Sequence, residues 1–266
     1  MVLSTGHGSA KLQVRGATKV YEAKTGPVHA LQDFSLEIRD GELVCIVGLS
    51  GCGKTTLLWA TAGLHALTSG EVLLDGRPVN GPRPDEIGMM FQDANLLPWR
   101  NLRSNIELPF EIKKRDVDVD RIEMLLDEVG LTGFDKAFPR ELSGGMQQRA
   151  SIVRALATDP GVLLMDEPFG ALDAFTRDEM NLLLMRLWTE TRKTILFVTH
   201  NIGEAIFLAD RVVVMTPRPG RLARVFDIDL PRPRTVAMTF EPDFIALIQE
   251  IKGAVEQGAR PTVRAA

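Results

Sequence analysis

The sequence GLSGCGKT, residues 48–55, decides the fold. It follows the short apolar run ELVCIV at 42–47 and precedes good helix formers at 55–62, so it reads as a loop between a buried strand and a helix. This order matches the phosphate-binding pattern G-x-x-x-x-G-K-[ST]. The glycines let backbone N–H groups approach phosphate oxygens, and the helix presents its positive dipole end to the same anion. We therefore expect Lys54 to neutralise the β- and γ-phosphates of a nucleotide and the Thr55 hydroxyl to bind magnesium.

This loop leaves two questions open. Cys52 lies beside the start of a helix, where a thiol can become reactive, but we favour a small loop residue that contributes only its backbone. The loop also does not say what the nucleotide is for, because kinases, GTPases and motor proteins share it. The remainder of the sequence has to decide.

A second candidate anion site lies in LSGGMQQR, residues 142–149. Ser143, Gly144 and Gly145 form a hydroxyl-bearing loop that opens a predicted helix running to about Thr158. A helix start of this composition can bind an anion through its backbone N–H groups, although a serine there can also be a simple N-cap. The chain therefore offers two helix starts suited to phosphate.

Two carboxylates end the apolar strand VLLMDE, residues 162–167. Side chains that follow each other on a strand point to opposite faces, so we expect Asp166 and Glu167 to have different roles. One can hold magnesium, through water, while the other orients the attacking water. An exposed acidic turn is the alternative, and its position after a buried strand disfavours it.

Short apolar runs alternate with helical patterns, which predicts a parallel sheet covered by helices on both faces. The expected strands are 12–21, 31–38, 42–47, 71–74, 87–91, 161–165, 194–199 and 211–215. The composition changes near Thr216, where prolines become frequent. We expect a flexible tail at 1–10, a main domain at 11–216 with a helical part at about 95–158, and a C-terminal extension at 217–266.

The composition excludes several classes of protein. The 266 residues are 45% hydrophobic and 25% charged, which is ordinary for a globular domain. A net charge of -4 argues against a dedicated nucleic-acid binder, and two cysteines are too few for a disulfide scaffold. No apolar run approaches the roughly 20 residues that span a bilayer, and residues 1–10 lack the pattern of a signal peptide. We expect a cytoplasmic chain that depends on another protein for any membrane span.

These motifs together closely resemble the ATP-binding cassette (ABC) ATPases, in family order from Tyr21 to about Met215. The resembling segments are 48–55 for the Walker A motif, 142–149 for the signature motif, 163–168 for Walker B with the catalytic glutamate, 170–173 for the D-loop, 199–201 for the H-switch, Gln92 within 90–93 for the Q-loop, and Tyr21 within 18–21 for the A-loop aromatic. The signature motif is specific to the family and argues against a P-loop kinase. Met146 replaces the glutamine common at its position, and we expect no loss of activity from it.

The resemblance implies a P-loop NTPase core of the ABC type, an α/β fold. In it a mixed sheet has flanking helices, a helical subdomain carries the signature motif, and a short C-terminal appendage follows. It also implies that Gln92 senses the γ-phosphate and links to a permease, that Glu167 is the general base, and that His200 holds the γ-phosphate and water. Among the implied ATP-binding residues, Tyr21 stacks on adenine, and Ser143 and Gly145 contact the ATP of the opposite subunit. The other implied ATP-binding residues are Gly48, Leu49, Ser50, Gly51, Cys52, Gly53, Lys54, Thr55, Thr56, Gly144 and Asp173. The implied magnesium ligands are Thr55, Gln92 and Asp166, the last through water, and the implied catalytic residues are Glu167, His200, Gln92 and Lys54.

Three further segments resemble the importers of nitrate, aliphatic sulfonates and taurine: LLPWR at 96–100, RPGR at 218–221 and LPRPR at 230–234. Related systems import bicarbonate or pyrimidine precursors, so the solute stays open. The resemblance implies ATP and Mg²⁺ as cofactors, a head-to-tail dimer with a second copy, an integral-membrane permease and, indirectly, an extracytoplasmic solute-binding protein. It places the chain on the cytoplasmic face of the inner membrane. The alternative is a soluble ABC ATPase of ribosomes, DNA repair or iron–sulfur assembly, which the single cassette and the lack of a long coiled-coil insertion disfavour.

The C-terminal extension is basic, and we interpret its arginines as a solvated surface. They are Arg218, Arg221, Arg224, Arg232 and Arg234. Contact with anionic lipid is the alternative. We likewise interpret His7, His29 and His65 as ordinary surface or loop residues.

Overall fold

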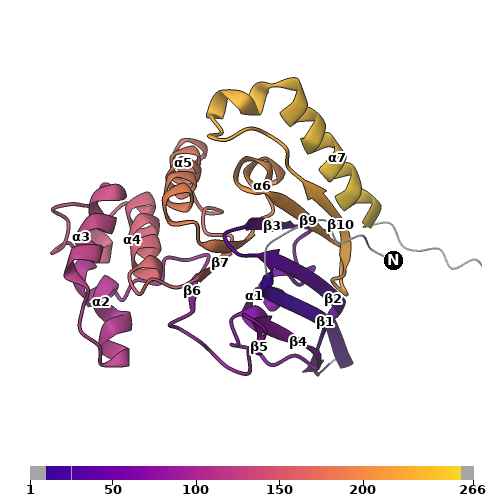
Figure 1. Cartoon of the computed structure of the whole chain (residues 1–266), viewed down its shortest axis with the longest axis horizontal. Helices are drawn as coiled ribbons and strands as arrows, with labels where there is room; N and C mark the ends of the chain where they lie inside the picture. The colour runs from indigo at the N-terminus through magenta and orange to yellow at the C-terminus, as the bar shows by residue number, and fades with distance from the viewer. Residues whose placement is uncertain (1–9, 25, 259–266) are drawn as a thin grey trace, which may run out of the picture.

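Two sheets form the body of the computed structural model, which describes residues 10–24 and 26–258 (Figure 1). In the larger sheet the strand order is β10-β9-β3-β8-β7-β6, parallel except that β10 is antiparallel to β9. Its strands are β3 (Leu43–Val47), β6 (Ile87–Met90), β7 (Val162–Asp166), β8 (Thr194–Val198), β9 (Arg211–Met215) and β10 (Leu222–Asp227). The smaller sheet is antiparallel, in the order β2-β1-β4-β5, and its strands are β1 (Ala10–Ala23), β2 (Gly26–Arg39), β4 (Ser69–Leu74) and β5 (Arg77–Pro78). All the expected strands are present, and the mixed sheet is confirmed.

The parallel strands are buried on both faces, because their side chains alternate between two hydrophobic clusters. In β3, Val44 and Ile46 belong to the cluster beneath the antiparallel sheet, whereas Leu43, Cys45 and Val47 belong to the cluster on the opposite face. The same alternation holds for β7, β8 and β9. The apolar runs that carried no alternating polarity in the sequence are therefore strands with no solvent face.

Helices cover both faces of the larger sheet. They are α1 (Lys54–Thr61), α2 (Leu102–Lys113), α3 (Val119–Glu128), α4 (Gly144–Leu156), α5 (Ala174–Thr191), α6 (Ile202–Leu208) and α7 (Pro242–Gly258), with short 3-10 turns at Pro139–Glu141 and Val236–Phe240. The buried Leu57 and Leu58 place α1 in the cluster between the two sheets. Figure 1 shows α2, α3 and α4 grouped beyond the β6 edge, while α5, α6 and α7 lie over the face opposite α1. Among the described residues, no helix combines the length and apolarity needed to cross a bilayer.

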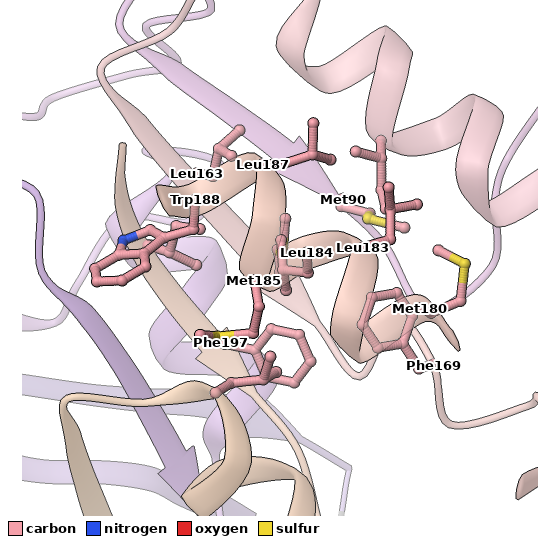
Figure 2. Packing of buried hydrophobic residues seen from close by; sticks show 14 of the residues in the cluster. Met90, Leu163, Phe169, Met180, Leu183, Leu184, Met185, Leu187, Trp188 and Phe197 are labelled. Atoms are coloured by element: carbon pink, nitrogen blue, oxygen red, sulfur yellow. The ribbon is translucent and has the colours of Figure 1, made fainter. Parts of the chain in front are cut away.

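Helix α5 fixes the segment that leaves β7. Figure 2 shows its inward side chains, among them Met180, Leu184 and Trp188, packed around Leu163 and Phe169. The Phe169 ring also lies 5.7 Å from that of Phe197 in β8, centre to centre. The segment between β7 and α5, which includes Glu167, is thus fixed at both of its ends.

The C-terminal segment continues the same core. β10 pairs with β9 along its length, and α7 packs against α6, β9 and β10. Phe244 and Ile251 of α7 are fully enclosed in the cluster that includes α5 and α6. Of the expected flexible tail, Ala10 begins β1, and residues 1–9 lie outside the described residues.

The interpretation of the C-terminal arginines as a solvated surface is wrong for Arg234. Only 3% of Arg234 is exposed, and burial lowers the pKa of its guanidinium to about 10. Its Nη1 donates to the carbonyls of Ile206, Phe207 and Ala209, and its Nη2 donates to the carbonyl of Ile228. A helix end leaves carbonyls without partners, and this guanidinium satisfies those of α6.

Replacing Arg234 should therefore destabilise the fold. Arg234→Met leaves several buried carbonyls unpaired, and we expect a loss of about 3 kcal/mol in the free energy of unfolding, measured by denaturant titration. Arg224→Met is the matched control. Arg224 is about half exposed and pairs with the equally exposed Glu250 at 2.6 Å, so its loss should cost under about 1 kcal/mol. Equal effects of the two substitutions would contradict this account of α6.

Candidate active site

The loop that follows β3 folds back around the amine of Lys54. Nζ of Lys54 donates to the carbonyl of Gly48 at 2.9 Å and to that of Leu49 at 3.3 Å, and only 5% of the residue is exposed. Gly53 caps α1 with φ at 108°, and a Cβ there would lie 2.6 Å from the carbonyl oxygen of Ala30. Glycine is required at this position because both the backbone angle and the space exclude a side chain.

A cavity of about 430 Å³ opens over this loop. Its lining includes the predicted residues Tyr21, Ser50, Gly51, Gly53, Lys54, Thr55, Thr56, Gln92 and Glu167, together with Val28, Ala30 and Arg218. The predicted residues thus converge on one cavity from β1, from the loop before α1, and from the chain after β6 and β7. Arg218 is the one charged lining residue that the sequence did not predict.

The two carboxylates after β7 have different partners at the edge of this cavity, as expected for different roles. Asp166 accepts a hydrogen bond from the Thr55 hydroxyl at 3.1 Å, and burial raises the pKa of Asp166. Glu167 lies just past the strand with φ at 44°, so its direction comes from a left-handed backbone rather than from strand alternation. Its Oε1 is 3.6 Å from Nζ of Lys54, and its Oε2 is 2.7 Å from Nδ1 of His200.

The oxygen atoms beside the phosphate loop fit a magnesium ion. Mg²⁺ prefers hard oxygen ligands and keeps several waters. The Thr55 hydroxyl and the Asp166 carboxylate are already adjacent, and Gln92 lines the same cavity. Burial, with a smaller contribution from Glu167, raises the pKa of Asp166 although the Thr55 hydroxyl and Lys54 act in the opposite direction, and a divalent ion beside this carboxylate would favour its charged form.

The signature residues lie outside the cavity. Ser143 caps α4 by accepting from the backbone N–H of Met146 at 3.3 Å, and Asp173 caps α5 by accepting from that of Thr176 at 3.1 Å. The two helix starts touch, since a Cβ on Gly145 would lie 2.8 Å from the Thr176 methyl. Within this single chain, Ser143, Gly144, Gly145 and Asp173 do not line the cavity beside Lys54.

The expected adenine-stacking residue has a neighbour that sequence reasoning missed. The Tyr21 hydroxyl lies 3.0 Å from Nδ1 of His65, whose ring meets that of Trp59 edge-on at 4.8 Å. Lys19 Nζ lies 4.9 Å from the centre of the Tyr21 ring. His65 is therefore a partner of the aromatic residue, and no local sequence signal distinguished it from a loop histidine.

The surroundings of Cys52 disfavour the reactive-thiol alternative. Only 1% of it is exposed, and burial raises the pKa of its thiol even though Lys54 acts in the opposite direction. A buried thiol with a raised pKa forms little thiolate. The structure therefore excludes the reactive-thiol alternative.

Comparisons with known proteins agree with this geometry. A model of the ABC transporter family matches residues 31–170. An ABC transporter ATP-binding protein of Methanocaldococcus jannaschii is 47% identical over 84% of each chain. A nitrate import ATP-binding protein of Synechocystis is 44% identical, covering 90% of this chain and 93% of its own, and a taurine import ATP-binding protein of Yersinia pestis is 43% identical, covering 92% and 97%. Among solved structures, a dimeric ATP-binding cassette in a post-hydrolysis state bound to ADP and Pi aligns with a TM-score of 0.73 and 33% identity, over 83% of this chain and all of that one.

Glu167→Gln tests the central carboxylate. The amide keeps the shape of the side chain but cannot take a proton, so we expect ATP binding to persist while hydrolysis falls about 100-fold or more in a steady-state phosphate-release assay. Glu256→Gln, an exposed change on α7, is the control and should leave the rate unaltered. A rate for Glu167→Gln within about threefold of the parent rate would exclude Glu167 as the base.

Proposed function

This chain belongs to the ABC transporter family of ATP-binding proteins, and on that premise we propose that it hydrolyses ATP to drive uptake of a small anion through a separate permease. The observation that carries the proposal is the position of Glu167 between Lys54 and His200, next to the Thr55–Asp166 pair. Phosphoryl transfer requires a cation that binds phosphate, a carboxylate that orients water, and oxygen ligands for magnesium.

The contacts of Lys54 support a simple order of events. Lys54 donates to the loop carbonyls of Gly48 and Leu49 and lies 3.6 Å from Glu167. We propose that the triphosphate supplies a stronger partner for Lys54, which frees Glu167 to accept a proton from the attacking water. The water oxygen bonds to the γ-phosphorus as the bond from that phosphorus to the bridging oxygen breaks, which yields ADP and inorganic phosphate. The His200 ring, hydrogen-bonded to the other carboxylate oxygen, keeps Glu167 oriented. Bound Mg²⁺ supplies charge neutralisation on the phosphates.

A second copy of the chain completes the site in this proposal. The signature residues lie apart from the cavity, although Ser143 with its two glycines forms a helix start suited to phosphate. Beside them Phe175 is 84% exposed, an apolar surface at the tip of α5 that a partner can cover. The similar solved cassette is a dimer. We therefore propose a head-to-tail dimer in which Ser143, Gly144 and Gly145 of each copy face the ATP held by the other.

The permease contact lies beside the Q-loop. Phe91, next to Gln92, lines an apolar cavity of about 350 Å³ together with Leu108 and Ile112 of α2. Ile112 is 72% exposed, and Trp99 in the preceding loop is 71% exposed. Of the three large apolar residues in the segment 96–100, Leu96 and Leu97 are partly buried, with Leu96 packed on the core, whereas Trp99 is exposed and available for a partner.

The relatives indicate the kind of solute. Relatives over 40% identical are named for the import of nitrate and of taurine, which are small and carry a negatively charged group. We propose a solute of this class, delivered to the permease by an extracytoplasmic binding protein while this chain works at the cytoplasmic face of the membrane. Neither the cavity over Lys54 nor its lining selects among these solutes, since this cavity is the proposed ATP site.

Mixing two inactive variants tests the composite site. Lys54→Ala removes the cation that is expected to bind phosphate, and Ser143→Arg blocks the helix start that carries the signature residues. In a head-to-tail dimer of one of each, both defects fall in one site and the other site is intact, so ATPase activity should exceed that of either variant alone. No recovery in dimers shown to be mixed, for example by tandem affinity tags, would contradict a site shared between copies.

Trp99→Ser tests the permease contact. In liposomes that contain the permease, with the matching binding protein and ATP, we expect uptake of nitrate, taurine or an alkanesulfonate to fall about 30-fold, because a buried aromatic contact of this size contributes on the order of 2 kcal/mol. The basal ATPase rate should stay near that of the parent. Phe240→Ser is the control, since Phe240 is 76% exposed but belongs to the C-terminal segment. Uptake of none of these solutes by the parent, with outward pumping of a lipophilic compound, would overturn the importer proposal.

A further inference from the structure

The RPGR segment after β9 is packed on the phosphate loop. Gly220 donates to the carbonyl of Ala30 at 3.0 Å, and its own carbonyl accepts from Gln32 at 3.0 Å, so the turn is fixed to β2. A Cβ on Gly220 would lie 2.2 Å from the carbonyl oxygen of Cys52. The Thr216 hydroxyl accepts from Arg221 N–H and donates to the Pro219 carbonyl, which closes the turn on itself. The turn between β9 and β10 is therefore a rigid wall of the phosphate loop.

This wall carries a guanidinium into the cavity over Lys54. Nε and Nη2 of Arg218 each lie 3.3 Å from the carbonyl oxygen of Gly51, and Arg218 lines the same cavity as Tyr21 and Thr55. A guanidinium has five N–H donors in a rigid plane. Two of them hold the Gly51 carbonyl, and Nη1 and the second hydrogen of Nη2 have no partner among the described residues.

Arg218 determines the net charge of the residues that line the cavity. The charged side chains that line it are Lys54, Glu167 and Arg218. Lys54 and Glu167 cancel each other, so Arg218 alone makes the lining net positive. A triphosphate brings several negative charges, and guanidinium groups bind phosphate oxygens with two parallel hydrogen bonds.

We propose that Arg218 is a nucleotide-binding residue, held by Gly51 so that its free N–H groups contact the α- and β-phosphates of bound ATP. The inference rests on the proposed function, because it assigns a further residue to the same ATP site. Gly51 precedes Lys54 in the loop and lines the same cavity as the expected stacking residue Tyr21. Glu167, the expected base at the γ-phosphate, pairs with Lys54 and His200 and not with Arg218. The contact therefore serves ADP as well as ATP.

Nucleotide affinity of the full chain tests this. Arg218→Gln should weaken Mg-ADP and Mg-ATP to a similar extent, about fivefold each, by isothermal titration calorimetry. Arg218→Lys keeps the charge and should recover more than half of the loss on a logarithmic scale. The difference between parent and Arg218→Gln should shrink on going from about 0.05 M to about 0.5 M salt, because the contact is exposed and screened. Arg221→Gln is the matched control: Arg221 is in the same turn, but it donates to Gln32 and is not part of the cavity lining.

The outcomes separate the alternatives. Unchanged affinities for Arg218→Gln, with a lower melting temperature of the nucleotide-free chain, would show a residue that only braces Gly51 and would overturn the inference. Weakening of ATP without ADP would overturn the assignment to the α- and β-phosphates. A parent chain that binds and hydrolyses ATP in either of these cases leaves the proposed function standing, whereas a parent chain that binds neither nucleotide overturns the proposed function itself.

Discussion

The buried amine of Lys54 is the constraint on which the site depends. A charge that is 95% buried is costly unless it is paired and hydrogen-bonded. The loop carbonyls of Gly48 and Leu49 satisfy part of this need and force the loop to fold over the amine. The remaining partner is Glu167, whose left-handed backbone directs it there. A phosphate bound at this loop would compete with Glu167 for the amine of Lys54, so in the proposed mechanism phosphate binding also releases Glu167 to act on water.

The second constraint is the parallel sheet, which brings distant segments to one edge. In an open α/β sheet, ligands bind beyond the carboxyl ends of the strands. The groups expected to act on phosphate, magnesium and water come from such ends: the phosphate loop after β3, Gln92 after β6, Asp166 and Glu167 at the end of β7, His200 after β8, and Arg218 after β9. Tyr21, by contrast, comes from β1 of the antiparallel sheet. Because β9, β3, β8, β7 and β6 are successive neighbours, these groups form one row. Arg218 therefore occupies a position equivalent to those of the known motifs, although it lies beyond the last of them.

The sequence could predict those parts of the structure that depend on local patterns. Glycine spacing located the phosphate loop, and unbroken apolar runs located the parallel strands. It missed β10, because its residues 222–227, LARVFD, do not alternate polar with apolar side chains. It also misjudged Arg234, whose burial depends on the end of α6 lying beside it. It also missed Arg218 and His65, because each owes its position to a segment more than 40 residues away. No local pattern reports contacts of that range.

Helix α4 connects the signature residues to the chain that follows the Q-loop. Its first turn carries the signature residues, and Gln148 one turn later donates to the carbonyl of Gln92 at 2.9 Å. Near its other end Arg154 donates to the carbonyls of Ala94 and Asn95, so the chain that follows the Q-loop is tied to the helix at two places. A helix of 13 residues is about 20 Å long and stiff. In the proposed dimer, a displacement of its N-terminus by the partner's ATP would therefore move residues 92–95 with it, and with them the apolar surface around Trp99. Such a rigid linkage would transmit ATP binding between two copies to the proposed permease contact at a distance from both phosphate sites.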